Sequence, residues 1–388
     1  MQGIPTSSAE RAPAPDLARG IMLLAIALAH APLYVETVGR GPGLLNDVVG
    51  VFHQFFVNNH ARPLFAFLFG YALVQLSQRQ AARGGEPAAV RKLLRRRGWW
   101  LVAIGFAHVA VLVPLDILAV YGITSVLLAG LVRAKDSTLL VTAGIVLVPS
   151  TALVALAMWF PMSQGRSTYE AGSIAAGTKG FAELLAERLT AWPFALVAGV
   201  FMVVPGVLAG VWAARRRLLE EPDRPFLVRA AWVTTVVSVA GALPAALMQT
   251  GLWAGPSAAA LWAAAIAQPL TGYAGGIGMA AIIALVALRP GNAVSTAVQA
   301  LGQRSMSFYL FQSIVFVAVF FPYGLGLQDD LGLAGASGVA VATWVASIAA
   351  AELMRRAGHR GPAEILLRRL AYRAPAAAAR PDRAADRV

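Results

Sequence analysis

Long apolar runs of about 20 residues recur along this chain, and short connections rich in arginine separate them. Runs of this length cross the hydrocarbon core of a bilayer as helices. Hydrophobic residues make up 58% of the 388 residues and charged residues only 13%, about half the charged share of an average soluble protein. A soluble fold, which needs charged groups to cover its outside, is therefore excluded.

The apolar windows predict an all-α, polytopic transmembrane bundle of about ten spans. The bundle forms one domain over residues 16–373; a cytoplasmic segment, residues 1–15, precedes it, and a disordered basic tail, residues 374–388, follows it. The predicted spans are residues 18–38, 59–78, 97–114, 116–133, 138–160, 191–214, 226–249, 258–288, 304–322 and 334–355.

Basic residues gather in every second connection between these spans. Because cytoplasmic loops carry the excess of Lys and Arg, we expect both termini in the cytoplasm and the chain in the cell inner (cytoplasmic) membrane as a multi-pass protein. The net charge of +13 then attracts the chain to anionic membrane lipid, and nucleic acid is not an expected partner. The basic connections include residues 79–97, 133–135, 215–229 and 289–304, and the weakly charged ones are residues 39–58, 161–190, 250–257 and 323–333.

The chain contains no cysteine. Disulfides, thiolate nucleophiles, cysteine-ligated zinc and iron–sulfur clusters are therefore excluded. The sequence has no P-loop, no HExxH and no paired carboxylates with metal-ligand spacing, so we expect no metal and no tightly bound cofactor. Any chemistry must rest on His, Asp, Glu, Arg, Tyr or Ser.

The first predicted span carries ionisable residues, which are costly at membrane depth and mark a functional site or a buried pair. Asp16 and Arg19 lie at its cytoplasmic mouth, and His30 follows Arg19 by eleven positions. Eleven positions are close to three helical turns, so both side chains share one face, ~16 Å apart. This spacing suits a ligand that enters from the cytoplasm. In the alternative reading, Arg19 reaches lipid phosphates and His30 is a core histidine.

A second polar cluster surrounds the start of the second span. His53 lies in the preceding connection, and Asn59, His60 and Arg62 lie just before Pro63, which suits the first turn of a helix. These residues are expected at or below the outer face, either as a binding site or as a polar helix cap at the lipid headgroups.

Three further features are ambiguous in the sequence. Asp116 could cap the fourth span or orient a histidine, and His108 stands alone on an apolar face and is predicted to be core. Tyr309, Gln312 and Ser313 share a helical face and could bind a ligand or join helices. The long segment 258–288 holds Pro269 and four glycines, which predicts a kinked or broken helix lining a cavity.

Several motifs resemble known membrane families. Asp16-Leu17-Ala18-Arg19-Gly20 followed by His30 resembles the opening of the transmembrane acyltransferase superfamily. The finer resemblance is to the DUF418 (YeiB-like) family, whose members commonly have Asn at the position of His30. It rests on residues 62–70 with Tyr71, on Asp116-Ile117-Leu118 with Tyr121, on residues 307–313, on residues 322–326 and on residues 361–364.

The resemblance implies an integral membrane acyltransferase. It would move an acyl group from a cytoplasmic donor, with acyl-CoA as co-substrate, to a hydroxyl or amine of a small-molecule or glycan acceptor. His30 would be the general base, assisted by Asp116 if the two side chains meet. The residues expected to bind donor or substrate are Asp16, Arg19, His53, Asn59, His60, Arg62, Tyr71, Tyr121, Tyr309, Gln312 and Ser313.

Two other functions stay open at this point. In a small-molecule transporter or exporter, segment 258–288 would form the substrate site and the histidines would bind substrate or relay protons. In a non-catalytic scaffold, His30, Asp116 and Gln312 could all be replaced without effect. The sequence also leaves open whether the protein forms a homodimer.

Overall fold

The computed structural model describes residues 13–372, apart from residue 178 and residues 221–222, and the described residues form helices and connections without strands. The predicted tail, residues 374–388, and nearly all of the predicted cytoplasmic segment lie outside the described residues.

Helices coincide with all ten predicted spans. The helices are α1 (Pro13–His30), η2 (Ala31–Tyr34), α2 (Gly43–Phe52), η3 (His53–Val57), α3 (Ala61–Ala81), α4 (Pro87–Val111), α5 (Leu118–Leu128), η4 (Leu131–Arg133), α6 (Asp136–Ser163), α7 (Thr168–Ala171), α8 (Phe181–Arg215), α9 (Arg224–Gln249), α10 (Ala258–Ala287), α11 (Ala293–Gly302), α12 (Ser305–Phe320), α13 (Leu333–Arg356) and α14 (Pro362–Ala371).

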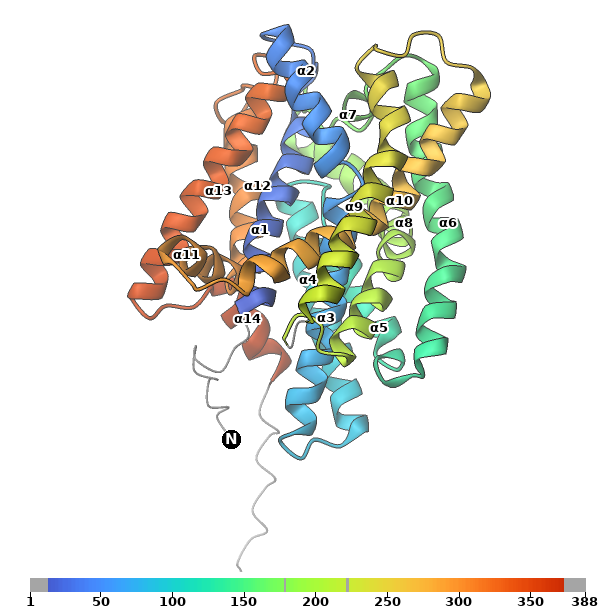
Figure 1. Cartoon of the computed structure of the whole chain (residues 1–388). Helices are drawn as coiled ribbons and strands as arrows, with labels where there is room; N and C mark the ends of the chain where they lie inside the picture. The colour runs from blue at the N-terminus through green and yellow to red at the C-terminus, as the bar shows by residue number, and fades with distance from the viewer. Residues whose placement is uncertain (1–12, 178, 221–222, 373–388) are drawn as a thin grey trace, which may run out of the picture.

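Six of these helices are long and apolar enough to cross a membrane: α1 with η2, α6, α8, α9, α10 and α13. The apolar helices α5 and α12 are shorter, and α4 begins in the arginine-rich stretch 91–97. The structure therefore supports a multi-pass membrane protein, while the count of ten spans and the orientation stay predictions. The α3–α4 turn and α14 lie at one end of the bundle, and α2 and α7 lie at the other (Figure 1).

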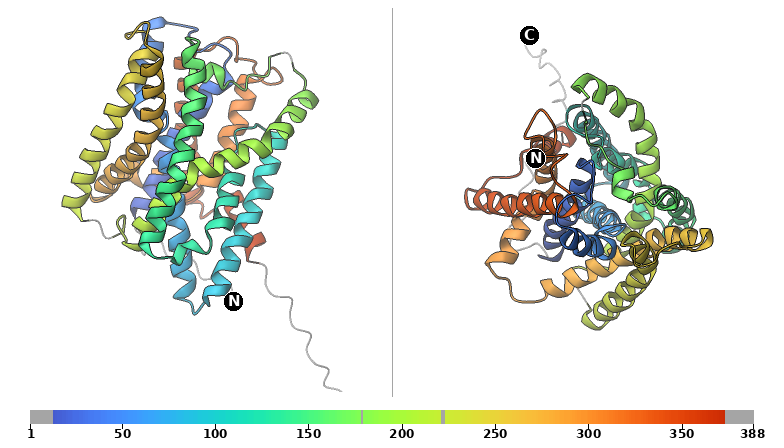
Figure 2. Two further views of the ribbon diagram at one scale, coloured as in Figure 1. Left: turned by 90° about the vertical axis from the view of Figure 1, so that its right-hand side faces the viewer. Right: turned by 90° about the horizontal axis from the view of Figure 1, so that it is seen from above.

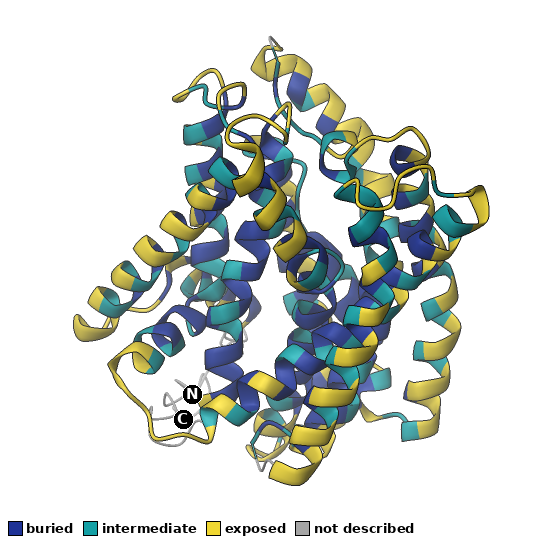
Figure 3. Cartoon of the chain, turned by 45° about the horizontal axis from the view of Figure 1, so that its top comes forward, coloured by how far each residue is buried: buried dark blue, intermediate teal, exposed yellow. Residues whose placement is uncertain are grey.

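Helix α1 lies inside the bundle, where it contacts α3, α10, α11, α12 and α13. Seen from above, the N-terminal helices occupy the middle and the later helices surround them (Figure 2). Exposed positions are frequent on the peripheral helices (Figure 3). They include large apolar residues, among them Ile145 of α6 and Trp232 of α9. A large apolar exterior is what a lipid-facing surface requires, because lipid tails replace water there.

Close backbone contact fixes the N-terminal half of α1. A Cβ on Gly20 would overlap the Val298 carbonyl of α11, and a Cβ on Gly302 would overlap the Asp16 carbonyl of α1. On another side of α1, the Trp344 indole donates to the Gly20 carbonyl oxygen at 2.9 Å. Small residues at helix crossings let backbones approach closely in membrane proteins, and here they hold α1 in register with α11 and α13.

Segment 258–288 is predicted to be kinked or broken, and α10 shows that it is not broken, while the kink stays a prediction. It is continuous from Ala258 to Ala287, with Pro269 inside it. Its glycines serve close packing: a Cβ on Gly272 would overlap the Asn59 carbonyl, and one on Gly275 would overlap the His60 ring. They let α10 pack directly against the start of α3.

Candidate functional site

Polar side chains from four segments meet in the interior, near the end of α1. His30 is the last residue of α1, His108 lies in the last turn of α4, and Asp116 precedes α5. Helix α12 contributes Tyr309 and Ser313. The sequence predicted four of these five residues as site residues, and the structure brings all five together.

Asp116 caps a helix and also lies beside a histidine. Its carboxylate accepts hydrogen bonds from the backbone N–H of Leu118 at 3.0 Å and of Ala119 at 2.7 Å, so it caps α5. The same carboxylate lies 3.4 Å from Nδ1 of His108, and both side chains are at most 2% exposed. A Cβ on Gly105, one turn before His108, would overlap this carboxylate, so the glycine permits the close approach of α4.

His108 joins Asp116 to a hydroxyl. Its Nε2 lies 2.9 Å from Oγ of Ser313, and its Nδ1 faces Asp116. Nε2 is thus hydrogen-bonded to the serine hydroxyl, whereas Nδ1 is buried beside the carboxylate and forms no hydrogen bond with any described residue. Carboxylate, imidazole and hydroxyl in this order are the arrangement in which a carboxylate orients an imidazole that accepts a proton. The prediction that His108 is a core residue is confirmed, because it is 3% exposed, but the prediction that it stands alone is wrong.

Tyr309 lies between two imidazole rings. Its hydroxyl donates to the Leu115 carbonyl at 2.7 Å and so fixes the connection that carries Asp116. Its ring centroid is 5.3 Å from that of His108 and 6.5 Å from that of His30.

His30 differs from His108 in its hydrogen bonding. It is half-buried, and its ring nitrogens form no hydrogen bond with any residue that the structure describes. Asp116 meets His108, so His30 has no direct carboxylate partner. His30 is nevertheless the imidazole of this cluster whose nitrogens are available to a ligand.

Gln312 ties this cluster to the middle of α1. Its amide nitrogen donates to the Leu23 carbonyl at 3.1 Å, while its Oε1 is buried without a partner among the described residues. A buried amide oxygen is costly when it accepts no hydrogen bond, so this atom is a candidate for contact with a ligand or water.

The N-terminal end of α1 holds the predicted pair of Asp16 and Arg19. The guanidinium of Arg19 forms an ion pair with Asp16, and Asp16 also accepts a hydrogen bond from the Gln303 amide at 3.0 Å. The Arg19 side chain keeps 26% of its surface exposed, so part of its charge remains accessible from outside the bundle.

The predicted outer cluster does not converge with this interior site. His53 is enclosed by hydrogen bonds on both ring nitrogens, from Nδ1 to the Tyr169 hydroxyl at 2.6 Å and from Nε2 to Ser337 Oγ at 3.0 Å. Burial lowers the pKa of His53 to about 4. His60 is held in the same way, by the Asn58 carbonyl at 2.6 Å and Ser238 Oγ at 2.5 Å. Both histidines join elements and have no nitrogen left for substrate.

Arg62 is held without a carboxylate. It donates to the Asn59 amide oxygen at 3.2 Å and contacts the Met202 sulfur at 3.4 Å, and among the described residues it forms no ion pair. The predicted Tyr71 and Tyr121 are structural: the Tyr71 hydroxyl accepts from the Leu219 N–H at 3.1 Å, and Tyr121 packs between two phenylalanines of α3.

Sequence reasoning missed two residues near the interior site. The signal for His108 is the short connection between α4 and α5. It brings the end of α4, which carries His108, beside Asp116 at the start of α5. Arg188 lies in a stretch predicted as an outer connection, but the structure places it in α8, where it is 4% exposed. Among the described residues, no group of three or more His, Asp or Glu side chains could hold a metal ion.

Fold and site together define a multi-pass helical membrane protein with a buried histidine–carboxylate cluster. Residues 213–374 match the model of the family described as "Protein of unknown function (DUF418)", which confirms the predicted resemblance to DUF418. The matched region includes α12 but not His30, His108 or Asp116.

The chain is also similar to the uncharacterized protein YxaH of Bacillus subtilis (strain 168). The two are 25% identical over 414 residues, which cover 95% of this chain and 96% of that protein. Neither description names an activity.

Proposed function

We propose that this protein is an integral membrane acyltransferase that moves an acyl group from a cytoplasmic thioester donor, such as acyl-CoA, to a hydroxyl or amine acceptor. The observation that carries the proposal is the interior cluster of His30, His108 and Asp116 around Tyr309. Ionisable groups inside a membrane bundle are expensive and are kept where they function.

His30 would be the general base of this reaction. Its ring nitrogens are not engaged by described residues, whereas His53 and His60 have both nitrogens hydrogen-bonded. Its nitrogen would take the proton of the acceptor O–H or N–H as the acceptor atom bonds to the acyl carbon. The carbon–sulfur bond of the donor then breaks, and the thiolate that leaves receives the proton from His30.

His108 and Asp116 would act as positioning residues. The Asp116 carboxylate lies 3.4 Å from His108, and the Tyr309 ring packs near both His108 and His30. A nearby carboxylate favours the imidazolium that forms when His30 accepts a proton. His108 also fixes Ser313, so the cluster is held from both α4 and α12.

Arg19 would hold the donor. It lies about three turns toward the cytoplasmic end from His30 on the same helix, ~16 Å away. A guanidinium binds phosphate oxygens through paired hydrogen bonds, which suits the phosphates of a CoA thioester.

The test is acyl transfer by the purified protein in lipid nanodiscs, with radiolabelled acyl-CoA and a polar extract of the native cells as the source of acceptor. We expect labelled product and free CoA thiol, and His30→Ala should lower the rate ~10²–10⁴-fold, the typical value of a general base. His359→Ala is the matched control, because His359 lies exposed in a connection. Undiminished transfer by His30→Ala would exclude His30 as the base.

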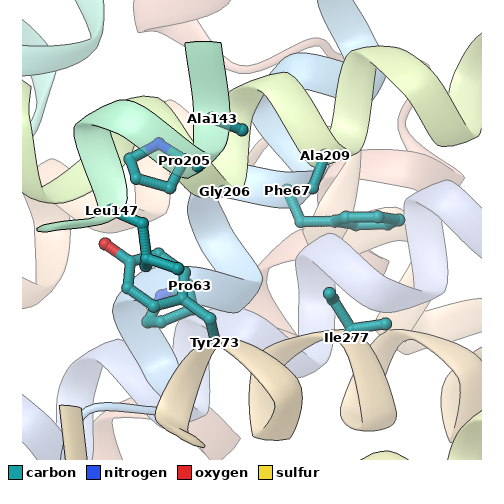
Figure 4. A pocket seen from close by; sticks show the side chains of 10 residues that line it. Pro63, Phe67, Ala143, Leu147, Pro205, Gly206, Ala209, Tyr273 and Ile277 are labelled. Atoms are coloured by element: carbon teal, nitrogen blue, oxygen red, sulfur yellow. The ribbon is translucent and has the colours of Figure 1, made fainter. Parts of the chain in front are cut away.

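Transport of a small molecule is the second candidate, and one cavity favours it. A cavity of about 150 Å³ lies between α3, α6, α8 and α10, beside Pro63, Leu147 and Tyr273 (Figure 4). The lining of this cavity is almost wholly apolar. His60 does not suit a proton relay, because both of its ring nitrogens are hydrogen-bonded. Solute flux into liposomes without any acyl product would favour transport over acyl transfer.

A further inference from the structure

Arg188 of α8 is a buried cation without a polar partner. The residue is 4% exposed, and both terminal guanidinium nitrogens are buried and form no hydrogen bond with any described residue. An arginine cannot shed its proton, so its charge must be compensated in place. A buried charge left without a partner is among the most costly features a fold can contain.

Its surroundings offset this cost only in part. The guanidinium carbon lies 6.0 Å from the centroid of the Phe321 ring, which is fully buried. The attraction between a cation and a ring face is weaker than that between a cation and an anion. Tyr34 packs against the same Phe321 ring, with 5.7 Å between the ring centroids, but no hydrogen bond joins Tyr34 to Arg188.

Two carboxylates near the start of α8 are engaged elsewhere. Glu187 pairs with Lys179 at 2.6 Å, and Glu170 accepts a hydrogen bond from the Val38 N–H at 3.2 Å. Asp116 is bound to the start of α5 and to His108. Among the described residues no carboxylate forms an ion pair with Arg188, so the part of the chain that the structure describes supplies no anion to it.

The position of Arg188 relates it to the interior cluster. Tyr34 ends η2, which continues directly from α1 one turn beyond His30. Tyr34 also packs against Phe316 of α12, with 5.5 Å between the ring centroids, and α12 carries Tyr309 as well. Along α1 the order is therefore Arg19, then His30, then Tyr34 with Arg188 beside it. The two arginines lie on opposite sides of His30.

We propose that Arg188 binds an anionic oxygen group, a carboxylate or a phosphate, of the acceptor substrate. The guanidinium presents paired donors that match such groups. The acceptor's nucleophilic hydroxyl or amine would then lie toward His30, with the donor phosphates held separately at Arg19. The substrate class is an anionic alcohol or amine. That the bound molecule is the acceptor rests on the proposed acyl transfer. The anion site itself does not depend on that proposal.

The first experiment uses the wild-type protein in detergent micelles, with inorganic phosphate and acetate as probes and sodium chloride at equal ionic strength as reference. We expect a saturable rise of the unfolding temperature at millimolar anion for at least one probe. Hydrogen–deuterium exchange should slow in the peptides that contain Arg188 and Phe321. No rise above chloride, a rise that never saturates, or protection located elsewhere would each overturn the proposal.

Variants then connect the effect to the guanidinium. Arg188→Gln and Arg188→Met should lose the anion-dependent rise, and Arg166→Gln, which changes an exposed arginine near the same end, should keep it. If neither Arg188 variant folds, the wild-type exchange data decide the question. Where transfer is measurable, Arg188→Gln should raise KM for the acceptor at least tenfold and leave KM for the donor unchanged. Anion binding without any acyl transfer would support the anion site at Arg188 and contradict the proposed acyltransferase function.

Discussion

At the scale of single residues, the four histidines buried or half-buried in the bundle differ in what their ring nitrogens bind. His53 and His60 each have both nitrogens hydrogen-bonded, and His108 has a serine on one side and a carboxylate on the other. His30 has no such bond with a described residue. Proton exchange with a substrate needs a nitrogen that is not already committed, so the same residue type is structural at three positions and available at one.

His53 makes the stability of the fold depend on pH. Burial lowers its pKa to about 4 from an ordinary value of 6.5. Between these values the unfolded chain binds a proton that the folded protein does not, so stability falls as the pH is lowered through this window, by up to ~3 kcal/mol. We expect the unfolding temperature of the purified protein to drop between pH 7 and pH 4.5.

The variant His53→Gln isolates this effect. It should be less stable than wild type at pH 7, because it loses hydrogen bonds, and the difference should shrink as the pH falls. His359→Gln should follow the wild-type curve, since that side chain is exposed. A difference between wild type and His53→Gln that stays constant with pH would contradict this assignment.

At the scale of elements, glycines decide which helices touch. Gly20 of α1 faces the Val298 backbone, whereas Gly338 of α13 has open space where a Cβ would be added. Alanine favours a helix over glycine by up to ~1 kcal/mol at either position. Gly338→Ala should therefore be neutral or stabilising. Gly20→Ala should destabilise by about 1–3 kcal/mol, because the backbone of α11 has to move.

Thermal unfolding of both variants in the same micelles measures this difference. Gly20→Ala should also lower acyl transfer, because α1 carries Arg19 and His30 and would shift as one rigid helix. Equal unfolding temperatures for the two variants would show that the α1–α11 contact tolerates a methyl group.

The sequence could predict the elements better than their contacts. Apolar runs locate the helices because the bilayer sets their length, and each predicted span coincides with a helix. The glycines of α10 were interpreted as a break, because glycine that loosens a helix and glycine that allows close packing look the same in a sequence. The contact of Asp116 with His108 depends on the geometry of the connection between α4 and α5. It also depends on Gly105, which has no side chain to overlap the Asp116 carboxylate. Spacing along the chain does not specify that contact.

At the scale of the whole molecule, the distribution of charge is the strongest global signal. The chain carries 32 Lys and Arg against 19 Asp and Glu. Such an excess in alternate connections predicts that the α3–α4 turn faces the cytoplasm and that the connection between α9 and α10 faces outward. These two connections lie at opposite ends of the bundle (Figure 1). On this orientation Arg19 would meet donors from the cytoplasm, and Arg188 would lie toward the outer side of His30.

The absence of cysteine makes this orientation directly measurable. Ala82→Cys in the α3–α4 turn and Ala254→Cys in the α9–α10 connection each introduce a single thiol at an exposed position. On intact cells, a membrane-impermeant maleimide should label Ala254→Cys and leave Ala82→Cys unlabelled; after permeabilisation it should label both. The cysteine-free wild type reports any background. Labelling of Ala82→Cys alone on intact cells would show that the orientation is opposite to the predicted one. Arg19 would then face outward, where no CoA thioester is expected, and the proposed path of the donor would be wrong.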